Sequence, residues 1–372
     1  MLTFNGTTPG PAIIADWGDN LIIHVTNNLA VNGTSIHWHG IRQLNNTEMD
    51  GVPGVTQCPI APGQTYTYKF QATQYGSTWY HSHFTTQYGD GLLGPLIING
   101  PATADYDEDL GMMFLSDWSH QTIDQLWDIA KQGAPPTLST GLINGTNTFD
   151  CTTVNDANCV GGGKKWETTF VAGQKYRIRI INSAVEGHFD FSIDGHSLTV
   201  IGMDLVPLVP YAADSVVISM GQRYDIIVEA TETSGDYWLR AQWITACSTN
   251  SLPNNITGII RYDSSSTADP TTTSTTTEST NCGDEPLASL VPYLAMDVGT
   301  YTSADITQED VSFAFADYFT WTINSSSLYL DWSDPTIMRI FNGEAVFPTD
   351  YNVVAIDVSL PSILLSPLKT NN

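Results

Sequence analysis

Short apolar segments separated by turn residues recur along nearly the whole chain, and this pattern limits the fold more than any other feature. The segments are rich in Val, Ile, Tyr and Thr, and Gly, Pro and Asn stand between them, as in "TYTYKFQA" (65–72) and "KYRIRIINSA" (175–184). Strands of this length with regular turns are typical of antiparallel sandwiches and barrels. The best amphipathic helix candidate is "QTIDQLWDIAKQG" (121–133). We therefore expect an all-β fold.

Two parts of the chain share one layout. "PIAPGQTYTYKFQA" (59–72) and "SVVISMGQRYDIIVEA" (215–230) each run strand, Gly-Gln, aromatic residue, strand. Each precedes a turn and a Trp-Tyr or Tyr-Trp pair, in "GSTWYHSH" (76–83) and "GDYWLRAQW" (235–243). This repetition indicates a duplicated Greek-key module. We predict a first domain at residues 1–102 and a second at 103–263. A Ser/Thr-rich linker follows at 264–285, and the opening of a third domain at 286–372.

Two His-x-His pairs, in "HWHG" (37–40) and "WYHSHF" (79–84), contain half of the eight histidines. Residues i and i+2 of a strand project from the same face, so each pair presents two imidazoles side by side. Two adjacent strands could bring all four together. A zinc enzyme would usually add a carboxylate or stop at three protein ligands, whereas clustered imidazoles suit copper. The pattern favours a multinuclear copper centre with four metal ligands: His37, His39, His81 and His83.

These pairs stand in a longer stretch that resembles a known family. "SIHWHGIRQLNNTEMDGVPGVTQCPIAPG" (35–63) and "GSTWYHSHFTTQYGDGLLGPLIING" (76–100) strongly resemble the first domain of the multicopper oxidases, in detail that of fungal, ascomycete-type laccases. "LINGTNTFDC" (142–151) and "GQRYDIIVEA" (221–230) extend the resemblance, which covers the chain to about residue 357. It implies tandem cupredoxin-like Greek-key β-sandwich domains, two near-complete and a third partial, with copper as the cofactor.

The resemblance also implies roles for individual residues. His37 would ligate the lone copper of a trinuclear cluster, and His39, His81 and His83 would ligate the coupled copper pair. Asp50 matches an acidic residue that assists proton delivery during O₂ reduction, although a turn-forming role before a glycine is the alternative. Glu186 matches the carboxylate of the substrate pocket, and a solvated loop glutamate is its alternative. Trp38 and Trp79 are expected to pack around the ligand strands. For the four other histidines we expect surface, core or loop positions: His24, His120, His188 and His196.

The sequence departs from the family pattern towards its end. The third domain of the family supplies a His-Pro-x-His-x-His run and a His-Cys-His run, but the last histidine here is His196 and the last cysteine is Cys282. The tail "SLPSILLSPLKTNN" (359–372) fits no strand that the family would have there. We therefore expect a chain truncated at both ends, without the blue-copper ligands and half of the cluster ligands. Such a chain would be inactive as an oxidase on its own.

The five cysteines give a second indication that part of the family's chain is missing. Cys151 and Cys159 bracket a short polar loop, and Cys247 and Cys282 flank the Ser/Thr-rich stretch, so each pair could form a disulfide. Cys58 is then left over. Three explanations remain open: its partner is missing, it forms an intermolecular bond, or it is a free thiol. The resemblance implies that Cys58 bridges to a cysteine near the end of the family's third domain.

Charge and sequons limit the partners and the location. The chain has 13 Lys+Arg and 39 Asp+Glu, and such an acidic surface repels nucleic acid. The sequence has no run of 18 apolar residues, so we predict no membrane-spanning helix. No signal peptide is visible, but the low lysine content, the acidity and the N-x-[ST] sequons favour a secreted glycoprotein. We also expect a monomer. The sequons begin at Asn5, Asn32, Asn45, Asn144, Asn255 and Asn324.

Three hypotheses for function follow. The first is a laccase-type enzyme that oxidises phenols or aromatic amines by one electron at a time and reduces O₂ to water. Ferroxidase and ascorbate oxidase remain open within the same superfamily. The second is a non-catalytic copper-binding remnant of a laccase, and the third is a fragment without a role of its own.

Overall fold

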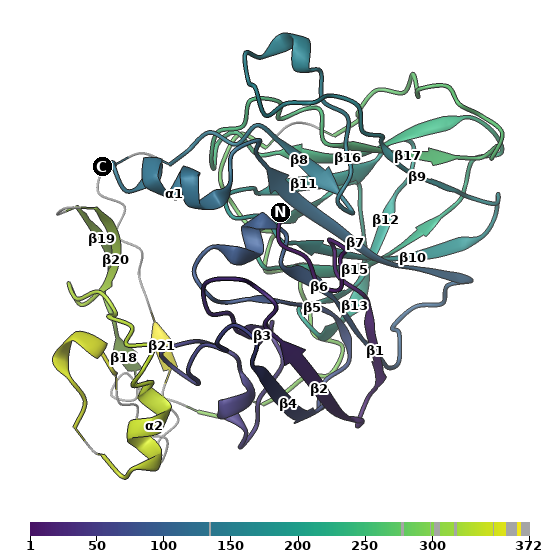
Figure 1. Ribbon diagram of the computed structural model, residues 1–372. Helices are drawn as coiled ribbons and strands as arrows, with labels where there is room; N and C mark the ends of the chain where they lie inside the picture. Colours follow the sequence, from purple (N-terminus) through teal and green to yellow (C-terminus); the bar gives the residue numbers. More distant parts are fainter. Residues whose placement is uncertain are drawn as a thin grey trace.

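A computed structural model describes residues 1–133, 135–276, 279–297, 299–300, 306–315, 318–344, 346–354 and 363–365, with the backbone alone for 306–308 and 363–365 (Figure 1). Strands dominate the described residues, and the expected all-β fold is confirmed. No helix in these ranges has the length and apolar character needed to cross a membrane.

The first unit is built from six strands in two sheets. A four-stranded sheet has the order β1-β6-β5-β3, and β2 pairs with β4 in a separate two-stranded sheet. The bounds are β1 (Ile13–Asp16), β2 (Asn20–Thr26), β3 (Ile36–Trp38), β4 (Thr65–Gln71), β5 (Gly76–Ser82) and β6 (Leu93–Asn99). Side chains from both sheets, among them Trp38, Tyr68, Leu96 and Ile98, are buried in one core cluster.

The second unit is larger and has a six-stranded sheet, β13-β12-β15-β10-β7-β8, and a five-stranded sheet, β14-β11-β16-β17-β9. Alternating buried side chains of both sheets, such as Ile178, Phe191, Val228 and Trp243, form its core. The bounds are β7 (Glu108–Trp118), β8 (Thr140–Ile143), β9 (Trp166–Thr169), β10 (Lys175–Asn182), β11 (Phe189–Ile193), β12 (Leu198–Met203), β13 (Val206–Ala213), β14 (Val216–Ile218), β15 (Arg223–Glu229), β16 (Asp236–Trp243) and β17 (Thr257–Arg261).

The two units repeat one strand arrangement. The order β1-β6-β5-β3 in the first unit matches β9-β17-β16-β11 in the second. In both, the outermost pairing is parallel (β1 with β6, β9 with β17), and the other two pairings are antiparallel. The duplicated layout in the sequence therefore corresponds to a duplicated topology.

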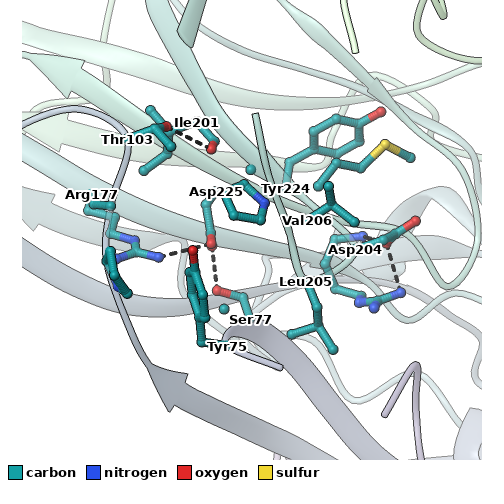
Figure 2. A pocket seen from close by; sticks show the side chains of 17 residues that line it. Tyr75, Ser77, Thr103, Arg177, Ile201, Asp204, Leu205, Val206, Tyr224 and Asp225 are labelled. Carbon is teal, nitrogen blue, oxygen red and sulfur yellow. Dashed lines mark hydrogen bonds and ion pairs between the residues drawn. The ribbon is translucent and has the colours of Figure 1, made fainter. Parts of the chain in front are cut away.

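Buried charges join the first unit to the second. Asp225 accepts a short hydrogen bond from Ser77 of β5 and pairs with Arg177 at 2.9 Å (Figure 2). Arg179 donates to the Ser77 hydroxyl at 2.9 Å and binds Asp109 on its other side. Because these groups are paired with one another, charge can be buried between the units.

The helix expected at 121–133 is present as α1 (Ile123–Ala130). The Thr122 side chain caps it by accepting from the Gln125 backbone N–H, and the Gln125 side chain accepts from the Thr122 backbone N–H, which makes a capping box. Three short 3₁₀ helices also lie in these two units: η1 (Thr47–Met49), η2 (Gln87–Asp90) and η3 (Cys151–Thr153).

The last part of the chain forms small elements beside the first unit (Figure 1). Its elements are β18 (Ile306–Gln308), β19 (Val311–Phe315), β20 (Phe319–Ile323), α2 (Thr336–Phe341), η5 (Thr349–Tyr351) and β21 (Ile363–Leu365). The backbone of Ile337 donates to Val55 at 2.9 Å, and the Trp332 ring packs on Phe84. β21 pairs with β18 in the tail, where the sequence pattern predicted no strand.

Both expected disulfides are present, Cys151–Cys159 and Cys247–Cys282. Cys58 is a free, exposed thiol among the described residues. The expectation of one unpaired cysteine is thus met within these residues.

Candidate metal centre

The two His-x-His pairs lie on neighbouring strands. β3 and β5 run antiparallel, and His37 stands directly opposite His81 in their register. His39 and His83 follow these strands, and their backbone N–H groups continue the pairing by donating to the opposite segment. The alternation of side chains along a strand then places all four imidazoles on one side of this pair.

The four rings gather around His37. The centroid of its ring lies 5.6 Å from that of His39, 5.4 Å from that of His81 and 5.5 Å from that of His83. One ring nitrogen each of His37, His39 and His81 lies within 4.8 Å of the others, which is close enough to share a metal ion. His83 is outside this tightest group but lies 6.0 Å from the His81 ring.

Backbone carbonyls orient two of the rings. His37 donates from Nδ1 to the carbonyl oxygen of Asp50 at 2.7 Å, and His81 donates from Nδ1 to that of Ser82 at 3.0 Å. A neutral imidazole has one donor and one acceptor nitrogen, so these bonds leave the Nε2 lone pairs free. His39 is turned the other way, with Nδ1 at 3.2 Å from His81 Nε2.

Aromatic rings support the cluster from behind. Trp79 stacks on His81 with centroids 4.1 Å apart and on His39 at 4.9 Å. Tyr88 of η2 contacts the His81 ring as well. Trp38 points to the other face of its strand and is 1% exposed in the core. Both tryptophans thus pack around the ligand strands, as the sequence predicts.

Burial favours the uncharged form of three of the imidazoles by lowering the pKa of each. It lowers the pKa of His39 to about 3, with help from the Arg223 guanidinium and the neighbouring histidines. Burial also holds the pKa of His81 well below its usual value and lowers that of His83. A neutral imidazole is the form that binds a metal, so these rings need lose no proton to do so.

A cavity of about 250 Å³ opens onto the cluster. Both units line it: His39, His81, His83 and Tyr88 come from the first, and Met220 and Gly221 from the second. The donor set and the free Nε2 lone pairs of His37 and His81 fit copper, which accepts several neutral imidazoles.

Asp50 lies beside this cluster at the end of η1. Its carboxylate Oδ1 is 3.4 Å from His37 Nδ1, and its side chain is 27% exposed. Gly51 follows with φ +83°, and a side chain there would collide with the Ile36 carbonyl of β3. Glycine therefore lets the Asp50 backbone approach the ligand strand closely.

Glu186 lines a second, more apolar cavity of about 690 Å³ between α1 and the β19–β20 hairpin. Its aromatic walls include Trp127, Phe315, Phe319 and Trp321. Tyr88 lines both this cavity and the one at the histidines. Burial raises the pKa of Glu186, and the nearby Asp117 carboxylate adds to this effect.

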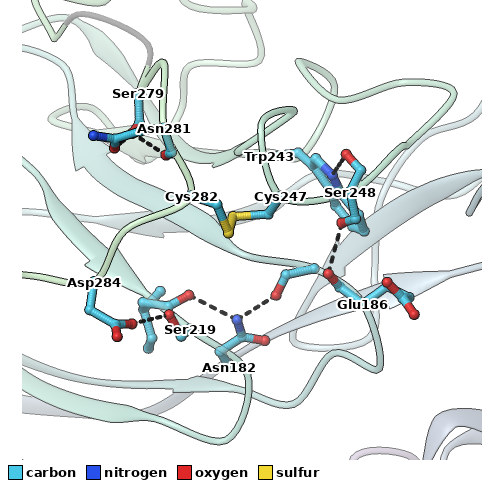
Figure 3. Close-up of a disulfide and its surroundings, with 12 residues drawn as sticks. Asn182, Glu186, Ser219, Trp243, Cys247, Ser248, Ser279, Asn281, Cys282 and Asp284 are labelled. Carbon is cyan, nitrogen blue, oxygen red and sulfur yellow. Dashed lines mark hydrogen bonds between the residues drawn. A yellow bond between two sulfur atoms is a disulfide. The ribbon is translucent and has the colours of Figure 1, made fainter. Parts of the chain in front are cut away.

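Asp117, which sequence reasoning missed, holds the backbone around Glu186. Its buried carboxylate accepts from the N–H groups of Val185, Glu186 and Gly187 at 2.8–3.2 Å. On the other side the Ser248 hydroxyl donates to the Glu186 carbonyl at 2.9 Å, next to the Cys247–Cys282 disulfide (Figure 3). The only signal in the sequence was an acid within a mostly apolar strand, "DLGMMFLSDW".

The remaining histidines lie away from the cluster. His24 is exposed and bonds to Thr67, and His120 pairs with Asp156 at 2.9 Å. His196 is buried and bonds to Tyr262. His188 lies near the sulfurs of Cys247 and Cys282, but these atoms are bonded to each other.

Comparison with known proteins identifies the family of the chain. Two family models, each described as "Multicopper oxidase", match residues 1–103 and 109–265. Laccase-2 of Botryotinia fuckeliana is 67% identical over 356 residues, which are 96% of this chain and 61% of that protein. Laccase-1 of the same organism is 60% identical with the same coverage. The chain thus spans about 61% of the length of these relatives.

Solved structures agree with the expected cupredoxin-like fold. The laccase from Botrytis aclada superimposes with a TM-score of 0.91 at 67% identity, covering 95% of this chain and 65% of that one. Fet3p, a multicopper oxidase that functions in iron import, gives a TM-score of 0.78 at 27% identity, covering 90% and 61%. This chain belongs to the multicopper oxidase family, which implies a copper cofactor.

Proposed function

We propose that this chain carries the first half of the copper site of a laccase-type multicopper oxidase. The observation that supports it is the antiparallel pairing of β3 with β5, which sets His37 opposite His81 and gathers three ring nitrogens within 4.8 Å. By family resemblance His37 serves the lone copper, and His39, His81 and His83 serve the coupled pair. Bound copper supplies one-electron chemistry that passes electrons from an organic substrate to O₂.

Asp50 is proposed to move protons at this site. The reduction of O₂ to water consumes protons, and a carboxylate that is partly exposed to solvent can take them up and pass them inward. The position of Asp50 beside His37, with 27% of its side chain exposed, supports this role.

Glu186 is proposed to receive the substrate. A phenol or aromatic amine fits a cavity with aromatic walls, and such a substrate becomes more acidic when it loses an electron. Asp117 and Ser248 hold the backbone of Glu186 at that wall, and its carboxylate can accept the released proton. The raised pKa of Glu186 makes it a better base than an ordinary glutamate.

The 372 residues have no His-Cys-His run, so we propose that they bind copper but do not oxidise phenols by themselves. A blue-copper site needs a cysteine thiolate and two histidines to take electrons from the substrate. We further propose a secreted, glycosylated monomer with domains at 1–102, 103–263 and 286–372 and a linker at 264–285.

The test loads the purified chain with Cu(I) without oxygen and counts copper by elemental analysis. We expect about one to two copper ions per chain, because four imidazoles can supply at most two ions with two ligands each. We also expect no intense visible thiolate-to-copper band and no O₂ uptake with a phenol. No bound copper would refute the proposed site. A blue colour or phenol oxidation would refute the claim that the chain needs further ligands.

A further inference from the structure

An arginine of the second unit reaches into the ligand strand of the first. Arg223 begins β15 and is 5% exposed. Its guanidinium lies against Gly40, the residue after the second histidine of "HWHG", and a side chain at position 40 would collide with it. Gly40 has φ +71°, so this position suits glycine in both conformation and space.

The guanidinium is fixed by residues of its own unit. Nη1 lies 2.7 Å from Oδ1 of Asp204 and donates to the carbonyl oxygen of Gly221 at 3.1 Å. The backbone N–H of Arg223 binds the same Asp204 carboxylate at 2.9 Å. The ion pair therefore holds the arginine, and the arginine holds the Gly221 carbonyl.

Gly221 in turn lies against His39. A Cβ atom built on Gly221 would be 3.2 Å from Nε2 of His39 and 3.0 Å from its Cε1, so the Nε2 edge of the ring faces this glycine. The Gly221 backbone also makes a hydrogen bond with the ring. The opposite nitrogen, Nδ1, faces Nε2 of His81.

His39 thus has two partners that demand opposite tautomers. With the proton on Nε2, the ring donates to the Gly221 carbonyl and offers the Nδ1 lone pair to the cluster. With the proton on Nδ1, it donates to His81 and blocks the cluster. A carbonyl oxygen has two lone pairs, so Gly221 can accept from Arg223 and from His39 together.

We propose that Arg223, by fixing the Gly221 carbonyl, selects the Nε2–H tautomer of His39 and so makes Nδ1 its metal-binding atom. Arg223 is a positioning residue, and the second unit completes a ligand that the first unit carries. The inference rests on the proposed copper site only for the metal measurements described below.

The first test reads the tautomer without metal. Histidine labelled with ¹⁵N in the metal-free chain gives two-bond ¹H–¹⁵N correlations that distinguish the two tautomers, and the loss of signals in H39Q assigns the ring. We expect the Nε2–H form in the wild type and a mixture or the Nδ1–H form in R223M. R177M is the matched control, because Arg177 is equally buried at the same interface and pairs with Asp225 but is not among the charges that act on His39.

R223K covers the case in which R223M does not fold. Lysine keeps the charge near Asp204, but its flexible ammonium lacks the rigid guanidinium plane that directs Nη1 to both Asp204 and the Gly221 carbonyl. It should therefore shift the tautomer as well. The inference is overturned if His39 keeps the Nε2–H form in both Arg223 variants, if the wild type has the proton on Nδ1, or if R177M changes the tautomer equally.

The second test measures copper affinity by Cu(I) titration against a competing chelator. Loss of a residue that orients a ligand weakens metal binding on the order of 10–100-fold, and we expect this for R223M but not for R177M. If the wild type binds no copper, the proposed function fails, and the tautomer measurement still decides the role of Arg223.

Discussion

The Nδ1 atom of His39 lies 3.2 Å from the Nε2 atom of His81, although 42 residues separate them in the chain. β3 and β5 bring the two residues together, and the stacked Trp79 ring holds both imidazoles. With His39 in the proposed Nε2–H form, both nitrogens present lone pairs that a common metal ion could bind.

Replacing His81 should remove copper. H81Q leaves a side chain without an imidazole at the centre of the cluster, so we expect about one copper ion fewer per chain, since each ion needs two or more of these rings. H24Q is the matched control, because His24 is exposed and bonds only to Thr67 among the described residues. Elemental analysis of both variants after identical loading gives the comparison, and equal copper content would contradict the ligand assignment.

A methyl group on Gly51 should disturb the same site through the backbone. The side chain of G51A would collide with the Ile36 carbonyl, whereas in G63A, also at positive φ, nothing lies within 4 Å. We expect G63A to lower the free energy of unfolding by about 1 kcal/mol through strain alone. G51A should cost about 1–3 kcal/mol more because of the collision, and it should weaken copper binding. Urea unfolding of both variants measures the difference; similar losses would contradict it.

The buried Lys165 should make stability depend on pH. Burial lowers the pKa of Lys165 to about 8 from its ordinary 10.5, and Nζ donates to Asn147 and Asn255. Between pH 8 and 10.5 the unfolded chain binds a proton that the folded chain does not, so the free energy of unfolding rises with pH there. K165M should lack this rise, and K175M, which alters a lysine with 45% side-chain exposure, should keep it. The free energy of unfolding of the wild type, K165M and K175M, each measured at pH 7, 9 and 10, tests the sign of this pH dependence.

The two disulfides should contribute unequally. Cys247 and Cys282 are 35 residues apart, and Cys151 and Cys159 are 8 apart. A longer closed loop restricts the unfolded chain more. Changing Cys247 and Cys282 to Ser should therefore lower the free energy of unfolding by about 4 kcal/mol, and changing Cys151 and Cys159 to Ser by about 2.5 kcal/mol. Thermal and urea unfolding of both variants compare them, and a larger loss from the shorter loop would go against the chain-entropy explanation.

Local patterns in the sequence were enough to predict much of the fold. Alternating apolar residues predicted the strands, the repeated Gly-Gln segments predicted the duplicated module, and the i, i+2 spacing predicted that His37 and His39 share a face. The strand pattern and the i, i+2 spacing depend on neighbours within a few residues, and the repeat appears when two segments are compared, so the sequence displays all three directly. The domain boundaries and the roles of Asp50 and Glu186 stay predictions.

The residues that hold His39 and Glu186 in place could not be predicted in the same way. Gly221 and Arg223 meet His39 across more than 180 residues, and no periodic pattern indicates which turns of two units will touch. Asp117 resembles an exposed strand residue, and only the fold brings three backbone N–H groups to its carboxylate. The choice of tautomer is a property of such long-range contacts.

The matching strand order of the two units also shows what occupies the second unit where the first has a histidine. When "GSTWYHSH" is laid on "GDYWLRAQW", Arg240 occupies the place of His81, and it forms two hydrogen bonds with the Asp194 carboxylate, which is 2% exposed. A histidine there would leave that carboxylate in the core without its counterion. A single change of Arg240 to histidine would therefore not reproduce the arrangement of the first unit, because Asp194 would have to change with it.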